Sequence, residues 1–360
     1  MKNDTISARN LGSLITIMIL CATLFGGSTS IGQDSWLLVP IAFIGTLPLI
    51  FIYSRTLSLY PGFGLFDILP RLFGKVIGIV VIGLFSIYAL FTGALALFNF
   101  SEHTVMIALE NTPRLVIMAI ILLVSLYLAF SGINNLGRWS FIICIVVMLN
   151  IIFTLALSFG TMDFSNIQPM FSHSLKDIAS DSLSSGVIAF GETVLAMGIF
   201  SSFRKGDKPK NAFLFSVIIG SSLLLLVILR NILVLGSSMF QSADFPSYTA
   251  TRIIHLGTFL EHVESLISFN LMLMGVTKIT LCIHVASIGI SKAVPKANNR
   301  ILLSVSGVLI FIIAALSFHD IEEIAIFIPS YRLIALIFIV LMPAVIWIFA
   351  EIKKNTGKRI

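Results

Sequence analysis

Two charged residues lie inside long apolar stretches of this sequence. Glu192 directly follows Phe190 and Gly191, and Lys278 lies three residues after Gly275. A charge inside a lipid bilayer is costly unless it is paired, hydrated or neutralised, so such residues commonly bind ligands, protons or other helices. We expect Glu192 to make one of these contacts. The alternative is a structural carboxylate that is hydrogen-bonded to neighbouring backbone.

Small and hydroxylated residues interrupt two apolar segments, one near the N-terminus and one around Glu192. The first interruption contains Cys21, Ala22, Thr23, Gly26 and Gly27, and the second contains Phe190, Gly191 and Glu192. Glycine weakens a helix, and the backbone groups that a broken helix frees can hold an amino or carboxylate group. The pattern therefore predicts two broken helices that form one ligand site. Taken singly, each segment could instead serve close helix packing.

Motifs of catalysis and cofactor binding do not occur in the sequence. It has no P-loop, dinucleotide fingerprint, nucleophile elbow or metal-binding histidine spacing such as H-E-x-x-H. The three cysteines, Cys21, Cys144 and Cys282, are far apart and lie in apolar stretches, so they imply no disulfide framework. We therefore expect neither an enzyme nor a cofactor or metal site.

The composition of the 360 residues requires lipid as the main solvent. Hydrophobic residues make up 57% and charged residues 11%, and the mean hydropathy is +1.04. A soluble surface needs about 25% charged residues, so we predict an integral membrane protein. Its apolar runs are continuous rather than alternating, which predicts an all-α fold. The net charge of +6 is explained by topology and by membrane lipids with anionic headgroups, and we expect no nucleic-acid partner.

Ten apolar segments are long enough to cross a bilayer, whose core needs about 20 residues per helix. They are 11–31, 36–54, 76–101, 115–131, 139–160, 183–203, 211–237, 260–287, 301–318 and 332–350. If the N-terminus is cytoplasmic, most lysines and arginines fall on the inner side and most acids on the outer side. The positive-inside rule thus predicts that both termini are cytoplasmic. In an outer loop, Pro246 is expected to begin a short helix.

The two predicted breaks lie in spans one and six, which are corresponding positions of two five-span halves. Because five is an odd number, a second copy of a five-span unit must be inverted in the membrane. Interrupted segments at matching positions indicate the binding site of inverted-repeat transporters. We predict a single transmembrane domain over residues 1–360, with repeats at about 11–160 and 183–350.

Residues of spans three and eight are expected to complete the wall of the site. They are Tyr88, Thr92 and Ala96 on span three, and Ser268, Met272 and Gly275 on span eight. The three on span three are spaced by four residues and therefore share one helix face. Arg230 lies about two turns from the outer end of span seven, and we expect it to snorkel outward or to pair with an outer acid.

Several short segments, in order along nearly the whole chain, resemble the B subunit of bacterial spore germinant receptors, the endospore germination permease family. They are Gln33-Asp34-Ser35-Trp36, Glu110-Asn111-Thr112-Pro113, Gly132-Ile133-Asn134-Asn135-Leu136-Gly137-Arg138, Phe190-Gly191-Glu192, Leu229-Arg230-Asn231-Ile232 with Leu235-Gly236, Phe245-Pro246-Ser247-Tyr248 and Phe259-Leu260-Glu261-His262-Val263-Glu264. The chain departs from the family at Cys21-Ala22, where Gly-Thr or Gly-Ser is usual, and at His262, where arginine is usual.

The resemblance implies ten helices in the amino acid–polyamine–organocation superfamily arrangement, a LeuT-like inverted repeat with helices one and six broken. It also implies a small-molecule germinant, usually an amino acid, bound between helices one, three, six and eight. The A and C subunits of a germinant receptor would be its partners in the spore inner membrane. We expect a germinant-sensing membrane subunit. The alternative is a proton-coupled secondary transporter of amino acids, because fold alone does not decide function.

Sodium-dependent transporters of the architecture that this resemblance implies hold sodium between helices one and eight. We expect the Lys278 ammonium to take the place of that cation by bonding to the carbonyls freed around Leu20 to Thr23. A fixed positive charge there would repel sodium strongly in a low dielectric. The alternative is a lysine that reaches the cytoplasmic headgroups.

Overall fold

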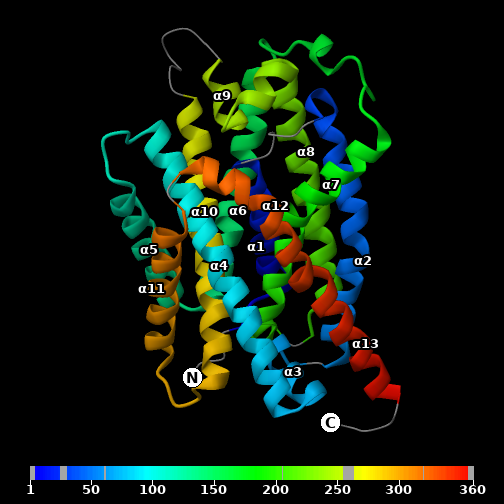
Figure 1. Cartoon of the computed structure of the whole chain (residues 1–360), viewed down its shortest axis with the longest axis vertical. Coiled ribbons are helices and arrows are strands. Elements are labelled where there is room, and N and C mark those ends of the chain that lie inside the picture. The colour runs from blue at the N-terminus through cyan, green and yellow to red at the C-terminus, as the bar shows by residue number, and fades with distance from the viewer. Residues whose placement is uncertain are drawn as a thin grey trace.

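The structure is a computed structural model that describes residues 5–24, 31–60, 62–204, 206–253, 263–318 and 320–355. These residues form one bundle of helices (Figure 1). In chain order the helices are α1 (Ala8–Leu20), η1 (Cys21–Leu24), η2 (Gly32–Leu37), α2 (Leu38–Leu59), α3 (Leu65–Phe73), α4 (Lys75–Ile107), α5 (Arg114–Phe130), α6 (Ile133–Ser158), η3 (Phe164–Ile167), α7 (Leu175–Ala189), η4 (Gly191–Ser202), α8 (Pro209–Ser242), α9 (Pro246–Arg252), α10 (Glu264–Ala293), α11 (Asn299–Ser317), α12 (Ile321–Leu336), η5 (Ile337–Leu341) and α13 (Met342–Asn355).

The predicted all-α fold with ten spans is confirmed in the described part of the chain. Seven helical segments there are long and apolar enough to cross a membrane, and the shorter apolar helices 8–23 and 114–130 supply the first and fourth spans. The sixth span is α7 together with η4, and the last is α12, η5 and α13. Between spans lie α9, which begins at Pro246 as predicted, and α3, a short amphipathic helix that the sequence analysis did not predict.

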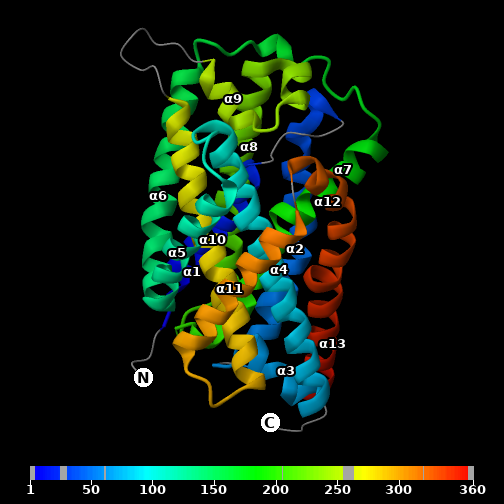
Figure 2. The same ribbon diagram turned by 60° about the vertical axis from the view of Figure 1, so that its left-hand side comes forward.

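The first and sixth spans run in opposite directions. The backbone N–H of Ile6 donates to the Ser202 carbonyl at 2.8 Å, and the Arg204 N–H donates to the Ile6 carbonyl at 2.9 Å. The segment that leads into α1 is thereby tied to the segment that ends η4, as an inverted repeat requires. The start of α1 and the end of α13 lie at the same end of the bundle, which agrees with an even number of crossings (Figures 1 and 2).

Helices one and six are broken where the sequence predicts. α1 ends at Leu20 and continues as a 3₁₀ turn, and α7 ends at Ala189 before a long 3₁₀ segment. At each break a threonine hydroxyl donates to the carbonyl three residues earlier: Thr23 to Leu20 at 2.7 Å, and Thr193 to Phe190 at 2.6 Å. The Phe190 carbonyl also accepts the Thr193 backbone N–H at 3.3 Å, and both hydroxyls add a hydrogen bond to a carbonyl where the α-helix ends. The predicted Gly26 and Gly27 lie outside the described residues.

Helix α1 and the η4 half of the sixth span lie inside the bundle, whereas α7 exposes Leu175 and Leu183, and other helices face the lipid. Residues 191–200 of η4 are all buried, whereas α5 exposes Leu123 and Tyr127, and α11 exposes Leu316. Such broad apolar exposure is favourable only against lipid. Glycines allow α10 and α4 to pack closely, since a Cβ atom at Gly93 would lie 2.9 Å from Cys282. Small residues of this kind are typical of helix contacts in membranes.

Candidate ligand site

The two buried charges that the sequence singles out form an ion pair. Lys278 donates from its ammonium to Oε2 of Glu192, and the two side chains are 11% and 5% exposed. Lys278 lies at the middle of the 30-residue helix α10, about 20 Å from either end at 1.5 Å per residue. That depth excludes the alternative in which its ammonium reaches the headgroups. Its partner is the Glu192 carboxylate rather than the backbone carbonyls around Leu20 to Thr23, so that prediction is wrong.

The Glu192 carboxylate also accepts a hydrogen bond from a residue that the sequence analysis did not consider. The Tyr331 hydroxyl donates to Oε1 of Glu192 at 3.1 Å, and it lies 3.3 Å from the Thr92 hydroxyl. Thr92, Glu192 and Tyr331 are almost fully buried. The polar cluster therefore joins η4, α10, α12 and α4, and it brings the predicted residues Glu192, Thr92 and Lys278 together.

The buried cluster is stable only while both of its charges, Glu192 and Lys278, are present. Two ions taken out of water are stable only when each compensates the other, and removing one partner of a buried pair costs about 3–5 kcal/mol. The pair is neutral overall and is enclosed by apolar helices. The pair therefore places one anionic and one cationic group beside the helix-six break.

Aromatic side chains cover the cluster on the side of α12 and η5. Tyr88 stacks on Phe338 with ring centroids 4.7 Å apart, and the enclosed Tyr88 hydroxyl has no hydrogen-bond partner among the described residues. Tyr53 donates to the Ile339 carbonyl at 2.6 Å, within the π-helical turn η5. A Cβ atom at Gly191 would lie 2.6 Å from Ile339, so glycine lets η5 pack directly on the helix-six break.

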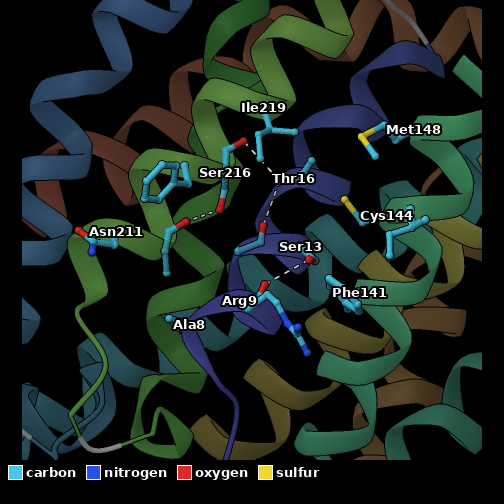
Figure 3. Close-up of a pocket in the computed structure, with 14 residues that line it drawn as sticks. Ala8, Arg9, Ser13, Thr16, Phe141, Cys144, Met148, Asn211, Ser216 and Ile219 are labelled. Atoms are coloured by element: carbon cyan, nitrogen blue, oxygen red, sulfur yellow. Dashed lines mark hydrogen bonds between the residues drawn. The ribbon is translucent and has the colours of Figure 1, made fainter. Parts of the chain in front are cut away.

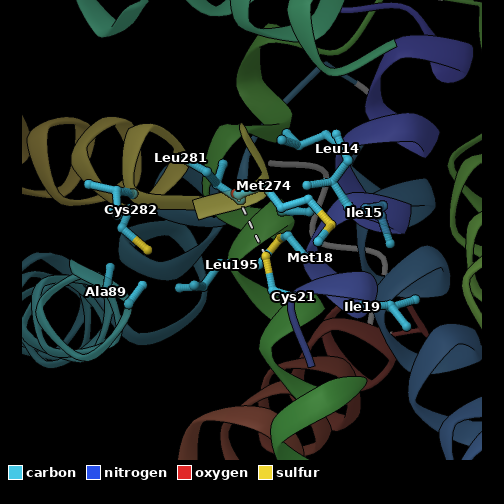
Figure 4. Packing of buried hydrophobic residues seen from close by; sticks show 14 of the residues in the cluster. Leu14, Ile15, Met18, Ile19, Cys21, Ala89, Leu195, Met274, Leu281 and Cys282 are labelled. Atoms are coloured by element: carbon cyan, nitrogen blue, oxygen red, sulfur yellow. Dashed lines mark hydrogen bonds between the residues drawn. The ribbon is translucent and has the colours of Figure 1, made fainter. Parts of the chain in front are cut away.

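The helix-one break contacts two other helices. The Cys21 thiol donates to the Met274 carbonyl of α10 at 3.7 Å, within a core that also contains Met18 and Leu195 (Figure 4). The Thr23 carbonyl accepts a hydrogen bond from the Ser247 hydroxyl of α9 at 3.3 Å. Ala22 is half-buried. The first break is thus attached to α10 one turn before Lys278.

The remaining predicted wall residues are placed as follows. Ala96 and Phe190 are buried, Met272 is half-buried against the core, and the Ser268 hydroxyl is enclosed without a hydrogen-bond partner in the described part of the chain. A Cβ atom at Gly275 would lie 2.6 Å from the Phe100 ring, so this glycine serves close packing of α10 on α4. Contact of these residues with a ligand stays a prediction.

Arg230 is neither at the outer surface nor paired with an acid of the described residues. Its guanidinium is buried and donates to the side-chain oxygens of Asn231 and Thr154 and to the Ser247 carbonyl, at 2.6–3.3 Å. The expectation of snorkelling is wrong because α8 continues to Ser242. The chain bends at Gly236, whose φ of 71° is non-helical, and Arg230 lies before this bend, enclosed by α6 and α9.

The sequence analysis missed Tyr331 and Tyr53. Tyr53 lies within the predicted span 36–54, and Tyr331 lies one residue before the predicted span 332–350. Tyrosines of membrane helices are common at the membrane interface, so the sequence offers no reason to expect either hydroxyl at the centre of the bundle. The one available signal was the need of the buried Glu192 for further hydrogen-bond donors.

Comparison with known proteins gives a family and a fold. Residues 5–323 match the family described as spore germination protein. The chain is 24% identical to spore germination protein KB of Bacillus subtilis (strain 168), over 100% of this chain and 98% of that protein. It is 23% identical to spore germination protein XB of Bacillus anthracis, over 90% of this chain and 91% of that protein.

Two solved structures share the fold at low sequence identity. Mhp1, a nucleobase-cation-symport-1 family transporter in a closed conformation with bromovinylhydantoin bound, gives a TM-score of 0.63 at 13% identity and covers 94% of this chain and 78% of Mhp1. MhsT in complex with L-phenylalanine gives a TM-score of 0.64 at 11% identity and covers 99% of this chain and 91% of MhsT. These likenesses show the LeuT-like fold.

Proposed function

This chain belongs to the spore germination protein family, and we propose that it is the germinant-sensing membrane subunit of a spore germination receptor. In this proposal an amino acid binds near the middle of the membrane, between the breaks of helices one and six. The proposal includes the spore inner membrane as its location, cytoplasmic termini, and the A and C subunits of the receptor as partners. The resemblance to receptor B subunits supports these last points.

The Glu192–Lys278 ion pair beside the helix-six break is the observation that supports an amino-acid ligand. A zwitterion carries the same two charges as the pair. Its ammonium can replace Lys278 at the Glu192 carboxylate, while its carboxylate takes the Lys278 ammonium and the backbone N–H groups at the breaks. A ligand with one charge would leave one protein charge uncompensated in a buried site, which is strongly unfavourable. The site therefore favours zwitterions.

Binding to the purified chain in lipid nanodiscs tests this function. We expect one or a few L-amino acids to raise the unfolding temperature, because a ligand at one hundred times its dissociation constant adds about 2.7 kcal/mol to stability. The Glu192→Gln variant should lose most of this shift, because its amide carries no charge for the ligand ammonium.

The chain supplies a matched control for that variant. Glu351 pairs with Arg55 at 2.6 Å near the surface, where both side chains are partly exposed. Glu351→Gln removes the same charge from a pair outside the site and should keep the ligand shift. The proposal fails if no amino acid stabilises the natural chain, or if Glu192→Gln responds like Glu351→Gln.

Proton-coupled transport is the second candidate, because the solved structures that share this fold include a transporter. Liposomes containing the chain distinguish the two functions. Uptake of the bound amino acid that increases with an inward proton gradient would support transport. Binding without accumulation would support a sensing subunit.

A further inference from the structure

A groove of 410 Å³ lies on the flank of the bundle, between α1, α6 and α8 (Figure 3). α1 contributes its floor, and α6 and α8 contribute its two walls. Ile145 on one wall and Phe215 and Ile219 on the other are exposed by 37–61%. Because apolar residues are exposed on both walls, the groove opens toward the lipid.

The groove begins at one end of the bundle and extends into the apolar zone. Along its floor, Arg9 lies in the first turn of α1, and Ser13 and Thr16 follow on the same side of that helix (Figure 3). Seven residues at 1.5 Å each give a depth of about 10 Å. The mouth is at the end that carries both termini, which the charge distribution predicts to be cytoplasmic.

The hydroxyl groups around the floor are already bonded within the protein. Ser13 donates to the Arg9 carbonyl at 3.1 Å, Thr16 donates to the Gly12 carbonyl at 3.0 Å, and the Ser216 hydroxyl donates to the Ala212 carbonyl. Few donors therefore remain for a polar solute. An aliphatic chain needs none, and it gains from covering the exposed apolar walls.

A cation stands at the mouth of the groove. The exposed Arg9 guanidinium lies 4.3 Å from the centre of the Phe141 ring. No carboxylate of the described residues forms a salt bridge with it. Asp207 accepts a hydrogen bond from the neighbouring Ala8 backbone N–H at 2.8 Å. The guanidinium N–H groups of Arg9 are therefore available to bind a phosphate group.

We propose that this groove binds an anionic phospholipid of the surrounding membrane. One acyl chain lies on α1 between α6 and α8, and the phosphate contacts Arg9. Basic pockets between membrane helices on the cytoplasmic side are suited to anionic headgroups. Because the floor is α1, which ends at the break before Cys21, the bound lipid braces the half-helix that leads to the proposed ligand site.

Native mass spectrometry of the full chain tests the site. The protein is released from membranes that contain equal amounts of phosphatidylglycerol and phosphatidylcholine with identical acyl chains. We expect the natural chain to retain phosphatidylglycerol preferentially, and Arg9→Gln to lower the ratio of the two retained lipids about fivefold, since a basic residue near the surface contributes on the order of 1 kcal/mol to anionic lipid binding. Arg300→Gln, an exposed charge on α11 outside the groove, should leave the ratio unchanged.

A second pair of variants tests the acyl-chain position. Ser13→Phe fills the floor and should reduce the total lipid retained, whereas Ser222→Phe makes the same change at an exposed position of α8 outside the groove and should not. Equal retention of the two lipids by the natural chain would overturn the proposal. So would an Arg9→Gln or Ser13→Phe variant that behaves like its control.

Discussion

Lys278 and Arg230 are both buried cations of this bundle, but the protein compensates their charges in different ways. Lys278 has a full negative charge as its partner, the Glu192 carboxylate. Among the described residues, the partners of Arg230 are neutral oxygens, from Asn231, Thr154 and the Ser247 backbone. A ligand that carries both charges can replace an ion pair, but it has no equivalent charge to exchange with a set of neutral oxygens. We therefore expect the Lys278 charge to serve ligand binding and the Arg230 charge to serve structure.

The neighbours of the two cations agree with this division. Lys278 pairs with Glu192 at the helix-six break, and it lies one turn after Met274, whose carbonyl accepts a hydrogen bond from Cys21 at the helix-one break. Arg230 connects α8 to α6 and α9, and Ser247 of α9 continues the network to the Thr23 carbonyl. Arg230 therefore holds the outer loop helix onto the end of helix one. We propose that its role is to fix a position rather than to contact a ligand.

The largest effect on stability is expected from separating the ion pair. Glu192→Leu leaves the Lys278 ammonium buried without a countercharge and should lower the free energy of unfolding in mixed micelles by about 3–5 kcal/mol. The double variant Glu192→Leu with Lys278→Met removes both charges and should recover most of that loss. If the losses of the two single variants simply added in the double variant, the two charges would not be coupled.

A smaller effect is expected from the tyrosine that supports the carboxylate. Tyr331→Phe removes one donor to Glu192 and should cost about 1.5–3 kcal/mol, as is usual for a hydrogen bond to a charged group. Tyr53→Phe is its matched control, because Tyr53 donates to the neutral Ile339 carbonyl and should cost only about 0.5–1.5 kcal/mol. Equal costs for the two variants in urea titrations would indicate that Glu192 does not carry a negative charge in the folded chain.

Replacing the structural cation should have a still smaller effect. Arg230→Met leaves only neutral oxygens without donors, so the free energy of unfolding should fall by about 1–2 kcal/mol, with no change in ligand selectivity. Arg252→Met, at the exposed end of α9, should stay within about 0.5 kcal/mol of the natural chain. A loss of zwitterion binding in Arg230→Met would contradict the structural role.

Sequence was sufficient for the number of spans, both breaks and the two charges of the ion pair. Long apolar runs and small-residue interruptions are local features, and a lipid solvent leaves few alternatives to a continuous helix. The breaks at Leu20 and Ala189 therefore fall where glycine, threonine and cysteine accumulate. The resemblance to spore germinant receptor subunits predicted the same architecture for the whole chain.

The partners of the buried charges could not be predicted in the same way. Glu192 and Lys278 are separated by 86 residues, and hydropathy does not determine how each helix is rotated about its axis. Arg230 was placed too near the outer surface because the apolar run ends before α8 does. Tyr331 was missed because hydrogen-bond donors for a buried carboxylate can come from any neighbouring helix, here α12.

The central claim is that the Glu192–Lys278 pair recognises both charges of an amino acid. Its most direct test is calorimetric binding of the amino acid that stabilises the chain most, beside its decarboxylated amine and its deaminated acid. The account predicts that the natural chain binds the amino acid about ten- to a hundredfold more tightly than either analogue. It also predicts that Glu192→Gln abolishes only the preference for the ammonium group, and Lys278→Met only the preference for the carboxylate. Equal affinity for the amino acid and one of its analogues, or a uniform loss for all three ligands in both variants, would contradict it.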